Sequence, residues 1–348
     1  MKIIYDLAYE DLALYLRNLN EPDYRGLQIW EGLYKQLWSN SFQFSQIPSA
    51  LRARIDQDFS FDALKLIDQS GSKDNSTTKV LFDLLDGHTV EAVLMEYKYR
   101  HTICISTQVG CAMGCSFCAT GQMGFIRHLT SGEITAQVLY FVRHLRQQDK
   151  SLSNIVIMGM GEPFHNYDNT MAAIERLSDP LGLQFDSKRF TVSTVGIIPK
   201  IIQFTHERRQ VNLAISLHAA DDVTRAKLLP IAKSYPLERL LDACKTYVDV
   251  TGRRITFEWA MIKEVNDSAK DAHLLVNLLR GLVCHVNIIP LNQTVGFQGE
   301  ASSPQRINAF QGILIENGIN CTIRLFRGVD IGAGCGQLLE KHRHDMRK

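Results

Sequence analysis

The sequence predicts an α/β fold with a parallel sheet, because strand-like runs alternate with amphipathic stretches of helical length over the last two thirds of the chain. The strand-like runs are Thr102–Ser106, Asn154–Met158, Arg189–Ser193, Asn212–Ser216, Ile255–Met261 and His285–Pro290. The first helical stretch begins with Thr130-x-x-Glu133, a capping box worth about 1 kcal/mol. Successive β-α units need right-handed crossovers, so the sheet is either open or curled into a partial barrel. A doubly wound sheet is the alternative, but no glycine-rich dinucleotide loop follows the first strand.

The segment before this alternation predicts short helices followed by a hairpin. Apolar residues recur at helical spacing in three stripes, Leu12–Leu19, Ile29–Leu37 and Leu51–Phe59. The polar stretch Asp68–Thr78 has the composition of a linker. Lys79–Phe82 and Val90–Leu94 are expected to be strands, joined at the hairpin signal Asp86-Gly87. We therefore divide the chain into a helical region over 1–75, a connecting hairpin over 76–100, a core domain over 101–325 and a C-terminal segment over 326–348.

The composition is that of an ordinary soluble globular protein. Of the 348 residues, 45% are hydrophobic and 22% charged, and no apolar run is long enough to cross a membrane. Because no signal peptide is recognisable at the start, we expect a cytoplasmic protein that does not bind membranes. The formal net charge of +1 neither supports nor excludes a nucleic-acid partner.

Three cysteines form the most informative motif. Cys111, Cys115 and Cys118 have the spacing C-x3-C-x2-C, which places three thiolates on one short loop. Iron–sulfur clusters take Cys thiolates as ligands, and three ligands for a four-iron cluster leave one iron open to a small molecule. Structural zinc, the alternative, needs four closed ligands, and no second pair of closely spaced cysteines occurs in the chain. The motif therefore predicts a redox or radical enzyme.

Polar residues and glycines lie where the predicted strands end, which is where reactive residues lie in β/α barrels. These positions are Met158–Pro163, Ser193-Thr194, Ser216–His218 and Asn292. Gly159 and Gly161 permit close approach of a ligand to the backbone, and Glu162 offers a carboxylate for an ammonium group. Any one of them alone is explained as a helix cap or turn residue, and His218 equally as a core histidine. Their occurrence at successive strand ends favours a binding site.

Several stretches resemble the radical S-adenosylmethionine (SAM) enzymes and, more narrowly, the RlmN/Cfr family of RNA adenine methyltransferases. They are Gly110–Gly121, Met158–Pro163, Ser193–Gly196, Ala214–His218, Val265–Asp267 and Cys335–Leu338. The resemblance covers nearly the whole chain. A lone C-x3-C-x2-C would identify only the superfamily, whereas its combination with Asp330-Ile331 and Cys335–Leu338 is specific to the family.

The resemblance implies a partial (β/α)6 radical SAM barrel with a small N-terminal helical domain that binds RNA and a C-terminal loop that carries a catalytic cysteine. It implies that Cys111, Cys115 and Cys118 bind a 4Fe-4S cluster whose open iron takes the amino and carboxylate groups of SAM. The residues implied to line the SAM site are Gly161, Glu162, Ser193, Ser216, Leu217, His218 and Asn292.

Three further residues are implied to be catalytic. Cys335 corresponds to the cysteine that becomes S-methylated, Cys104 to a second reactive cysteine and Glu91 to a proton acceptor. Without the resemblance, Cys104 would be interpreted as a core residue of an apolar strand and Glu91 as an exposed strand carboxylate. The catalytic roles of both residues therefore rest on the resemblance. Cys335 lies in the glycine-rich run Gly332–Gly336, whose flexibility suits a residue with several partners.

The implied reaction explains why two additional cysteines are needed. The target is an sp2 carbon of adenine, which is too weak a nucleophile to attack the SAM methyl group directly. One SAM methylates the Cys335 thiolate, and a second is cleaved to a 5′-deoxyadenosyl radical, which takes hydrogen from the S-methyl group; two SAM molecules are used per turnover. The methylene radical adds to the adenine ring. Loss of the ring proton to Glu91 or Cys104, with formation of a Cys104–Cys335 disulfide, releases the product.

The resemblance leaves the methylated carbon open. One branch of the family methylates carbon 2 of an adenine in the peptidyl-transferase centre of 23S rRNA, and often a tRNA anticodon-loop adenine. The other methylates carbon 8 of the same rRNA adenine and confers antibiotic resistance. Pro163, the run Ile289–Asn292 and Arg327-Gly328 favour the carbon-2 branch. A third alternative is a non-catalytic iron–sulfur protein that binds RNA. Gln293, Gly332 and Gly334 depart from the family pattern without touching the implied ligands.

Partners and the remaining cysteines complete these expectations. We expect a monomer that uses an external electron donor such as a flavodoxin system. Phosphate-binding charge is expected on the N-terminal helices, from Arg17, Arg25, Lys35, Arg52 and Arg54. Cys244, Cys284 and Cys321 lie in apolar patterns and are expected to be core residues.

Overall fold

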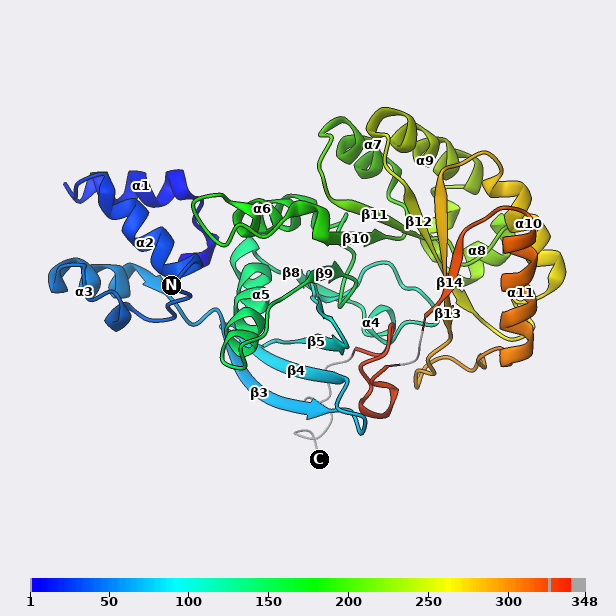
Figure 1. Ribbon diagram of the computed structural model, residues 1–348, viewed down its shortest axis with the longest axis horizontal. Helices are drawn as coiled ribbons and strands as arrows, with labels where there is room; N and C mark the ends of the chain where they lie inside the picture. The colour runs from blue at the N-terminus through cyan, green and yellow to red at the C-terminus, as the bar shows by residue number, and fades with distance from the viewer. Residues whose placement is uncertain (1, 325–326, 339–348) are drawn as a thin grey trace.

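One mixed sheet organises the chain (Figure 1). The computed structural model describes residues 2–324 and 327–338. Within them the main sheet has ten strands in the order β14-β13-β12-β11-β10-β9-β6-β5-β4-β3. Its strands are β3 (Leu64–Gly71), β4 (Thr77–Leu84), β5 (Thr89–Tyr97), β6 (Arg100–Cys104), β9 (Asn154–Ile157), β10 (Phe190–Thr194), β11 (Asn212–Ser216), β12 (Ile255–Met261), β13 (Cys284–Pro290) and β14 (Cys321–Ile323).

The parallel part of the sheet confirms the predicted fold class. The six predicted strands are β6 and β9 to β13, and each pairs in parallel with its neighbour along the chain. A seventh, β14, was not predicted and pairs in parallel with β13. Because the strand order never reverses, the fold is not doubly wound. The curved sheet is an incomplete barrel, with β14 at one edge and β3 at the other.

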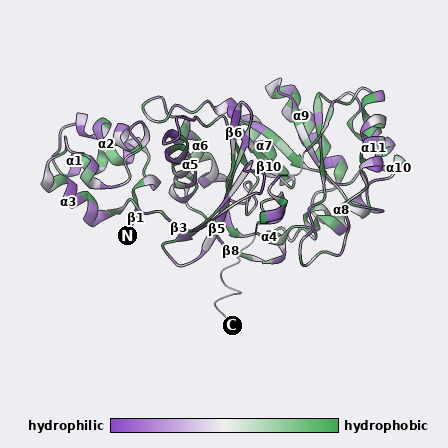
Figure 2. Cartoon of the chain, turned by 60° about the horizontal axis from the view of Figure 1, so that its bottom comes forward, coloured by the Kyte–Doolittle hydropathy of each residue, from purple (hydrophilic) through white to green (hydrophobic). Residues whose placement is uncertain are grey.

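Helices connect the parallel strands and cover the sheet. They are α5 (Ser131–Arg146), α6 (Tyr167–Ser178), α7 (Ile198–His206), α8 (Asp222–Leu228), α9 (Leu237–Thr251), α10 (Ala269–Leu279) and α11 (Pro304–Glu316). The predicted capping box at the start of α5 is confirmed: the Thr130 hydroxyl accepts from the Glu133 amide at 3.2 Å, and the Glu133 carboxylate accepts from the Thr130 amide at 2.9 Å. These helices carry both polar and apolar residues (Figure 2), as expected for amphipathic helices that pack one face against a sheet.

The N-terminal helices lie as a lobe beside α5 and α6 (Figure 1). They are α1 (Tyr9–Asn18), α2 (Tyr24–Tyr34) and α3 (Ser49–Asp58), one for each predicted stripe. The short strands β1 (Lys2–Ile3) and β2 (Phe59–Ser60) pair beneath them. The lobe is fixed to the barrel because the Asp6 carboxylate accepts from the Gly132 amide at 2.6 Å, and Arg143 donates to the Leu37 carbonyl at 2.7 Å.

The expected linker over Asp68–Thr78 is wrong at both ends, because β3 extends to Gly71 and β4 begins at Thr77, whereas the hairpin is confirmed. β3 continues to Gly71, and only the turn before β4 separates these strands. β4 and β5 pair antiparallel around Asp86-Gly87, as predicted. Most side chains of β3 are exposed because it is an edge strand, so its composition resembles that of a linker. A smaller hairpin, β7 (Gln108–Gly110) and β8 (Phe125–His128), flanks the cysteine loop, which leads into α4 (Ala119–Gln122).

The C-terminal segment, described from residue 327 to 338, crosses the open side of the barrel. Arg327 donates to the Glu96 carbonyl on β5 at 3.1 Å, and the Asp330 carboxylate accepts from the Lys73 amide at 2.9 Å. Further on, the Gly336 carbonyl accepts from the Ala119 amide at 2.8 Å. The segment therefore links the β3–β5 side of the barrel to the cysteine loop. In the part of the chain that the structure describes, no helix has the length and apolarity needed to cross a membrane.

Candidate active site

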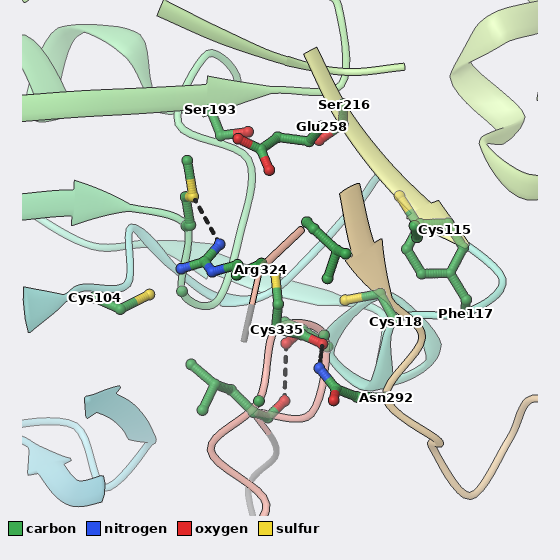
Figure 3. A pocket seen from close by; sticks show the side chains of 18 of the residues that line it. Cys104, Cys115, Phe117, Cys118, Ser193, Ser216, Glu258, Asn292, Arg324 and Cys335 are labelled. Atoms are coloured by element: carbon green, nitrogen blue, oxygen red, sulfur yellow. Dashed lines mark hydrogen bonds between the residues drawn. The ribbon is translucent and has the colours of Figure 1, made fainter. Parts of the chain in front are cut away.

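A cavity of about 190 Å³ lies between the cysteine loop, the ends of the parallel strands and the C-terminal segment (Figure 3). The predicted site residues that line it are Cys104, Cys111, Cys115, Cys118, Gly161, Glu162, Ser193, Ser216, His218, Asn292 and Cys335. They come from seven regions of the chain between β6 and the C-terminal segment. Of the predicted set, Leu217 and Glu91 do not line the cavity within the described residues.

Backbone contacts fix the shape of the cysteine loop. Gly110 precedes the loop with φ +71°, and a Cβ atom there would lie 1.9 Å from the Gly124 carbonyl oxygen, so only glycine fits. The Cys111 amide donates to that carbonyl at 2.8 Å. At the far side, the Ser116 amide donates to the Leu228 carbonyl at 3.0 Å. The loop is thus held between β8 and the end of α8.

The three loop cysteines have the chemistry of cluster ligands. Burial raises the pKa of Cys111 to about 12, and it raises the pKa values of Cys115 and Cys118 as well. Because burial disfavours the charged thiolate form, binding to positively charged metal ions would stabilise these cysteines as thiolates. Among the described residues, no group of three or more Cys, His, Asp or Glu side chains converges on a single point to bind one metal ion. In a four-iron cluster each thiolate binds a different iron, so three cysteines along one cavity wall fit it better than they fit zinc.

Glu162 is a buried carboxyl at the end of β9. One carboxylate oxygen accepts from the Phe164 amide at 2.9 Å and the other from the Val195 amide at 2.9 Å, which ties the β9 loop to the β10 loop. Burial raises the pKa of Glu162 to about 7. Gly161, with φ +101°, brings the backbone so close to Gln108 that a Cβ atom would lie 2.5 Å from the Gln108 Cβ. A bound ammonium group would favour the ionised carboxylate here.

His218 is both a buried histidine and a wall of the cavity. Its Nδ1 accepts from the Ala260 amide at 2.9 Å, and burial lowers its pKa to about 3, so the ring stays neutral. The Phe117 ring lies edge-on to it at 5.0 Å. Leu217 packs into the core, and its carbonyl accepts from the buried Arg225 guanidinium at 3.2 Å. The Leu217 amide also donates to the Glu258 carbonyl at 3.1 Å, so both backbone groups of Leu217 are used within the protein and the structure does not bring this residue to the cavity.

Asn292 has an unsatisfied acceptor in the cavity wall. Its amide nitrogen donates to the Cys335 carbonyl at 3.1 Å, whereas its buried Oδ1 has no hydrogen-bond donor among the described residues. Buried polar atoms are normally hydrogen-bonded, so this oxygen fits a ligand that carries an N–H or O–H group. SAM carries such groups on its amino acid and its adenine. The residues present therefore fit both the cluster and SAM.

Two cysteines outside the loop meet in the same cavity. Cys104 ends β6, and Cys335 approaches from the C-terminal segment. Both are free thiols. Burial and the neighbouring Cys335 raise the pKa of Cys104 to about 12, while Arg324 acts to lower it. Burial likewise raises the pKa of Cys335 against the lowering effect of Arg324, although the cavity leaves this side chain exposed.

Arg324 and Glu258 are site residues that the sequence analysis missed. Arg324 follows β14 and extends into the cavity among Cys104, Cys335 and Glu258 (Figure 3), with one guanidinium nitrogen 4.0 Å from the Met158 sulfur. Glu258 lies in the middle of β12 and accepts from the Asn287 amide at 2.8 Å, and burial raises its pKa. A charged residue inside an otherwise apolar strand was the available signal for Glu258.

Glu91 lies on β5 close to the cavity. It forms a buried ion pair with Lys79 on β4, with 2.9 Å between Nζ and Oε1. Lys79 also donates to the Gly332 carbonyl at 3.4 Å, so it contacts the C-terminal segment. Because side chains alternate along a strand, Glu91 shares its face of β5 with Val93, which lines the cavity and pairs across from Cys104.

The remaining sequence predictions have mixed outcomes. Cys244 and Cys284 are buried in the core as expected, while Cys321 is only half-buried. Three of the five expected cations of the N-terminal region pair with a carboxylate four residues away along the chain. Lys35 lies 2.8 Å from Glu31, Arg54 lies 2.8 Å from Asp58, and Arg25 lies 3.8 Å from Glu21. Arg17 and Arg52 make no ion pair with a described carboxylate.

Comparisons with known proteins agree with this site. The Radical SAM superfamily profile matches residues 105–276. The chain is 46% identical to "Dual-specificity RNA methyltransferase RlmN 1" of Myxococcus xanthus, over 96% of this chain and 93% of the relative. It is 43% identical to "Probable dual-specificity RNA methyltransferase RlmN" of Geobacillus kaustophilus, over 98% and 93%. The crystal structure of a radical SAM methyltransferase from Sphaerobacter thermophilus is 46% identical and superposes with a TM-score of 0.95, over 97% of this chain and 99% of that chain.

Proposed function

Since the chain belongs to the RlmN family of radical SAM enzymes, we propose that it methylates carbon 2 of an adenine in the peptidyl-transferase centre of 23S rRNA. We include an adenine of the tRNA anticodon loop, because the relatives are described as dual-specificity RNA methyltransferases. The superfamily implies a 4Fe-4S cluster and SAM. We propose two SAM molecules per turnover, because Cys335 would need one methyl donor and the radical step another.

One observation carries this proposal: Cys104 and Cys335 line the same cavity as the three loop cysteines. A radical SAM enzyme needs only the three loop cysteines for its cluster. Two more free thiols in that cavity match a reaction in which one thiol carries the methyl group and the other releases the product.

Each group in the cavity has a proposed role. Cys111, Cys115 and Cys118 would hold the cluster, and Gly161, Glu162, Ser193, Ser216, His218 and Asn292 would hold SAM. Leu217, the other residue implied by the resemblance, would hold Ser216 and His218 in position from the core. Together the cluster and SAM supply, when bound, the electron and the radical needed to activate a methyl group.

The reactive residues act in sequence. Cys335 carries the methyl group as a thioether, and Arg324 favours the thiolate form that accepts it. Glu91, whose Oε1 lies 2.9 Å from Lys79 Nζ, is the proposed proton acceptor for the ring hydrogen. Attack of the Cys104 thiolate on the Cys335 sulfur then breaks the carbon–sulfur bond; the electron pair stays with the methylene carbon, which takes up one proton to become the methyl group of the product. The unpaired electron that radical addition leaves on the adenine ring would be accepted by the cluster. The disulfide that forms must be reduced by a thiol reductant before the next turnover.

The wider organisation follows the same proposal. Residues 1–75 would form the RNA-binding accessory domain, except for β3, which belongs to the main sheet; 76–100 would form the connecting hairpin, 101–325 the radical SAM core, and 326–348 the segment that carries Cys335. We propose a cytoplasmic monomer that receives electrons from an external donor such as a flavodoxin system.

The experiment is mass spectrometry of nucleosides from 23S rRNA and tRNA of a deletion strain, with and without the restored gene. We expect 2-methyladenosine to appear in both RNAs on restoration. 8-Methyladenosine instead would contradict the carbon-2 assignment. Neither product, from protein that carries its cluster, would refute an rRNA or tRNA substrate.

A further inference from the structure

Resting on the proposed function, we propose that the turn between β5 and β6, together with Arg327, is the RNA-contacting rim of the cavity. This rim consists of Tyr97, Lys98, Tyr99, Arg100 and Arg327. We infer that it grips the backbone of an RNA loop and stacks on the base next to the adenine that enters the cavity.

The rim is continuous with the cavity. Tyr97 and Arg327 both line it, as do Val93 and Met95 on the same face of β5. Tyr97 pairs with Arg100 at the beginning of β6, the opposite end of that strand from Cys104. The cysteine loop follows the carboxyl ends of the strands, so the rim lies toward the other end of the barrel. An adenine that enters past the rim would thus approach the reactive cysteines from the side away from the cluster.

Two guanidinium groups are already held on one aromatic ring. The Arg100 and Arg327 guanidinium carbons each lie 4.2 Å from the centre of the Tyr97 ring. Cation–π contacts of this kind fix the arginines in place without neutralising them. Arg327 also has a buried Nε for which the described residues offer no acceptor. Fixed and uncompensated guanidinium groups suit phosphate binding, because their N–H groups match phosphate oxygens in geometry.

The tip of the turn presents an aromatic ring to solvent. Tyr99 is 86% exposed, which is unusual for so large an aromatic side chain, and the Lys98 ammonium lies 5.1 Å from its ring centre. An enzyme that modifies a base must draw it out of its stack, and an aromatic ring can stack on the bases that remain. Tyr99 with Lys98 offers the two elements of single-stranded RNA binding, a stacking ring and a phosphate-binding cation.

Within the described part of the chain, the carboxylates near the rim do not pair with its cations. Glu96, the acidic residue next to Tyr97, is engaged by Lys150 at 2.8 Å and by His101 at 3.7 Å. Asp74, on the β3–β4 turn, interacts electrostatically with Arg327 but forms no ion pair with it among the described residues; its hydrogen bonds come from Ser72 and Ser76. Lys98 and Arg100 form no ion pair within the described residues. The N-terminal cations Arg25, Lys35 and Arg54 differ in this respect, since they are paired with carboxylates.

The test compares Tyr99→Ala and Lys98→Ala in the cluster-loaded enzyme, with an RNA stem-loop that carries an unpaired adenine as the probe. Lys245→Ala and Ile315→Ala are matched controls, because both side chains are exposed on the outer helices α9 and α11. Dissociation constants are measured by fluorescence anisotropy over a series of salt concentrations. Because the Tyr99 side chain is highly exposed, Tyr99→Ala should fold as the wild type does, so misfolding would not explain weaker RNA binding.

We expect Tyr99→Ala to raise Kd by about 5- to 100-fold, the loss of one stacked base. Lys98→Ala should reduce the slope of log affinity against log salt by about one, the loss of one phosphate contact. Both controls should bind as the wild type does. Wild-type affinity and salt slope in both rim variants would overturn the inference. Failure of the wild type to methylate the same RNA would instead count against the proposed function, so the two results are distinguishable.

Discussion

Replacement of Arg324 by methionine should make Cys335 a poorer nucleophile. Arg324 is the cation that acts to lower the pKa of Cys335, and Glu258 acts to raise it. Burial already raises the pKa of this thiol, so the guanidinium limits the cost of forming the thiolate. Methionine keeps much of the length and apolar volume of arginine but removes the charge.

The expected size of the pKa change follows from the position of Arg324 relative to Cys335. An opposite charge within contact range shifts a pKa by about 1–3 units, and the exposure of Cys335 to the cavity favours the lower half of that range. A rise of one to two units reduces the thiolate fraction about 10- to 100-fold at a fixed pH below the pKa. The alkylation rate should fall by the same factor, because the thiolate is the reactive species.

The assay is alkylation of reduced, cluster-loaded protein with iodoacetamide over a range of pH, with Cys335 followed by peptide mass spectrometry. Arg327→Met is the matched control: it removes a guanidinium that also lines the cavity but is not among the groups that mainly set the pKa of Cys335. Glu258→Gln should move the rate in the opposite direction, toward faster alkylation. If the Arg324→Met profile overlays that of the wild type, the electrostatic explanation is refuted.

Three further predictions concern stability and assembly. Burial holds the pKa of His218 at about 3, below the value of about 6.5 in an unfolded chain, so the unfolded state binds more protons and stability falls as pH decreases from about 6.5. His218→Asn should reduce the dependence of the free energy of unfolding on pH by up to about 1.4 kcal/mol per pH unit, as measured by urea unfolding at several pH values. The same pH dependence in the variant and the wild type would contradict this prediction. Gly110→Ala forces a Cβ against the Gly124 carbonyl, so the purified protein should contain little iron, and normal iron content would show that the loop tolerates alanine. Lys79→Met removes the cation paired with buried Glu91 and should cost about 3–5 kcal/mol in urea unfolding, with partial recovery in Lys79→Met/Glu91→Leu. A single variant as stable as the wild type would make that pair energetically unimportant.

Most of the sheet was predictable because its parallel strands are buried. β6 and β9 to β13 are runs of four to seven residues rich in apolar and β-branched side chains, and the helices between them begin at recognisable caps. β14 has three residues, too few for a strand pattern to emerge. β3 is long enough for a strand pattern, but it was not predicted as a strand because its exposed edge position favours polar residues.

Site residues that follow a strand could be predicted from the sequence, whereas a site residue inside a strand could not. The strand-end rule located Glu162, Ser216 and Asn292, whereas Glu258 lies inside β12 and Arg324 follows the strand that was missed. The pairing of the N-terminal cations was also readable, since Arg54 and Asp58 are four residues apart on one face of α3. Spatial proximity of Cys104 and Cys335 was not readable without the resemblance, because more than two hundred residues separate them.

The central claim, that Cys335 carries the methyl group and Cys104 releases the product, has a direct test in Cys104→Ala. The purified, cluster-loaded variant is incubated anaerobically with SAM, a reductant and substrate RNA, and the products are digested and examined by mass spectrometry. We expect a covalent protein–RNA adduct attached through a methylene group to Cys335, because nothing cleaves the carbon–sulfur bond. Release of free methylated RNA at the wild-type rate, or an adduct on another residue, would contradict the account.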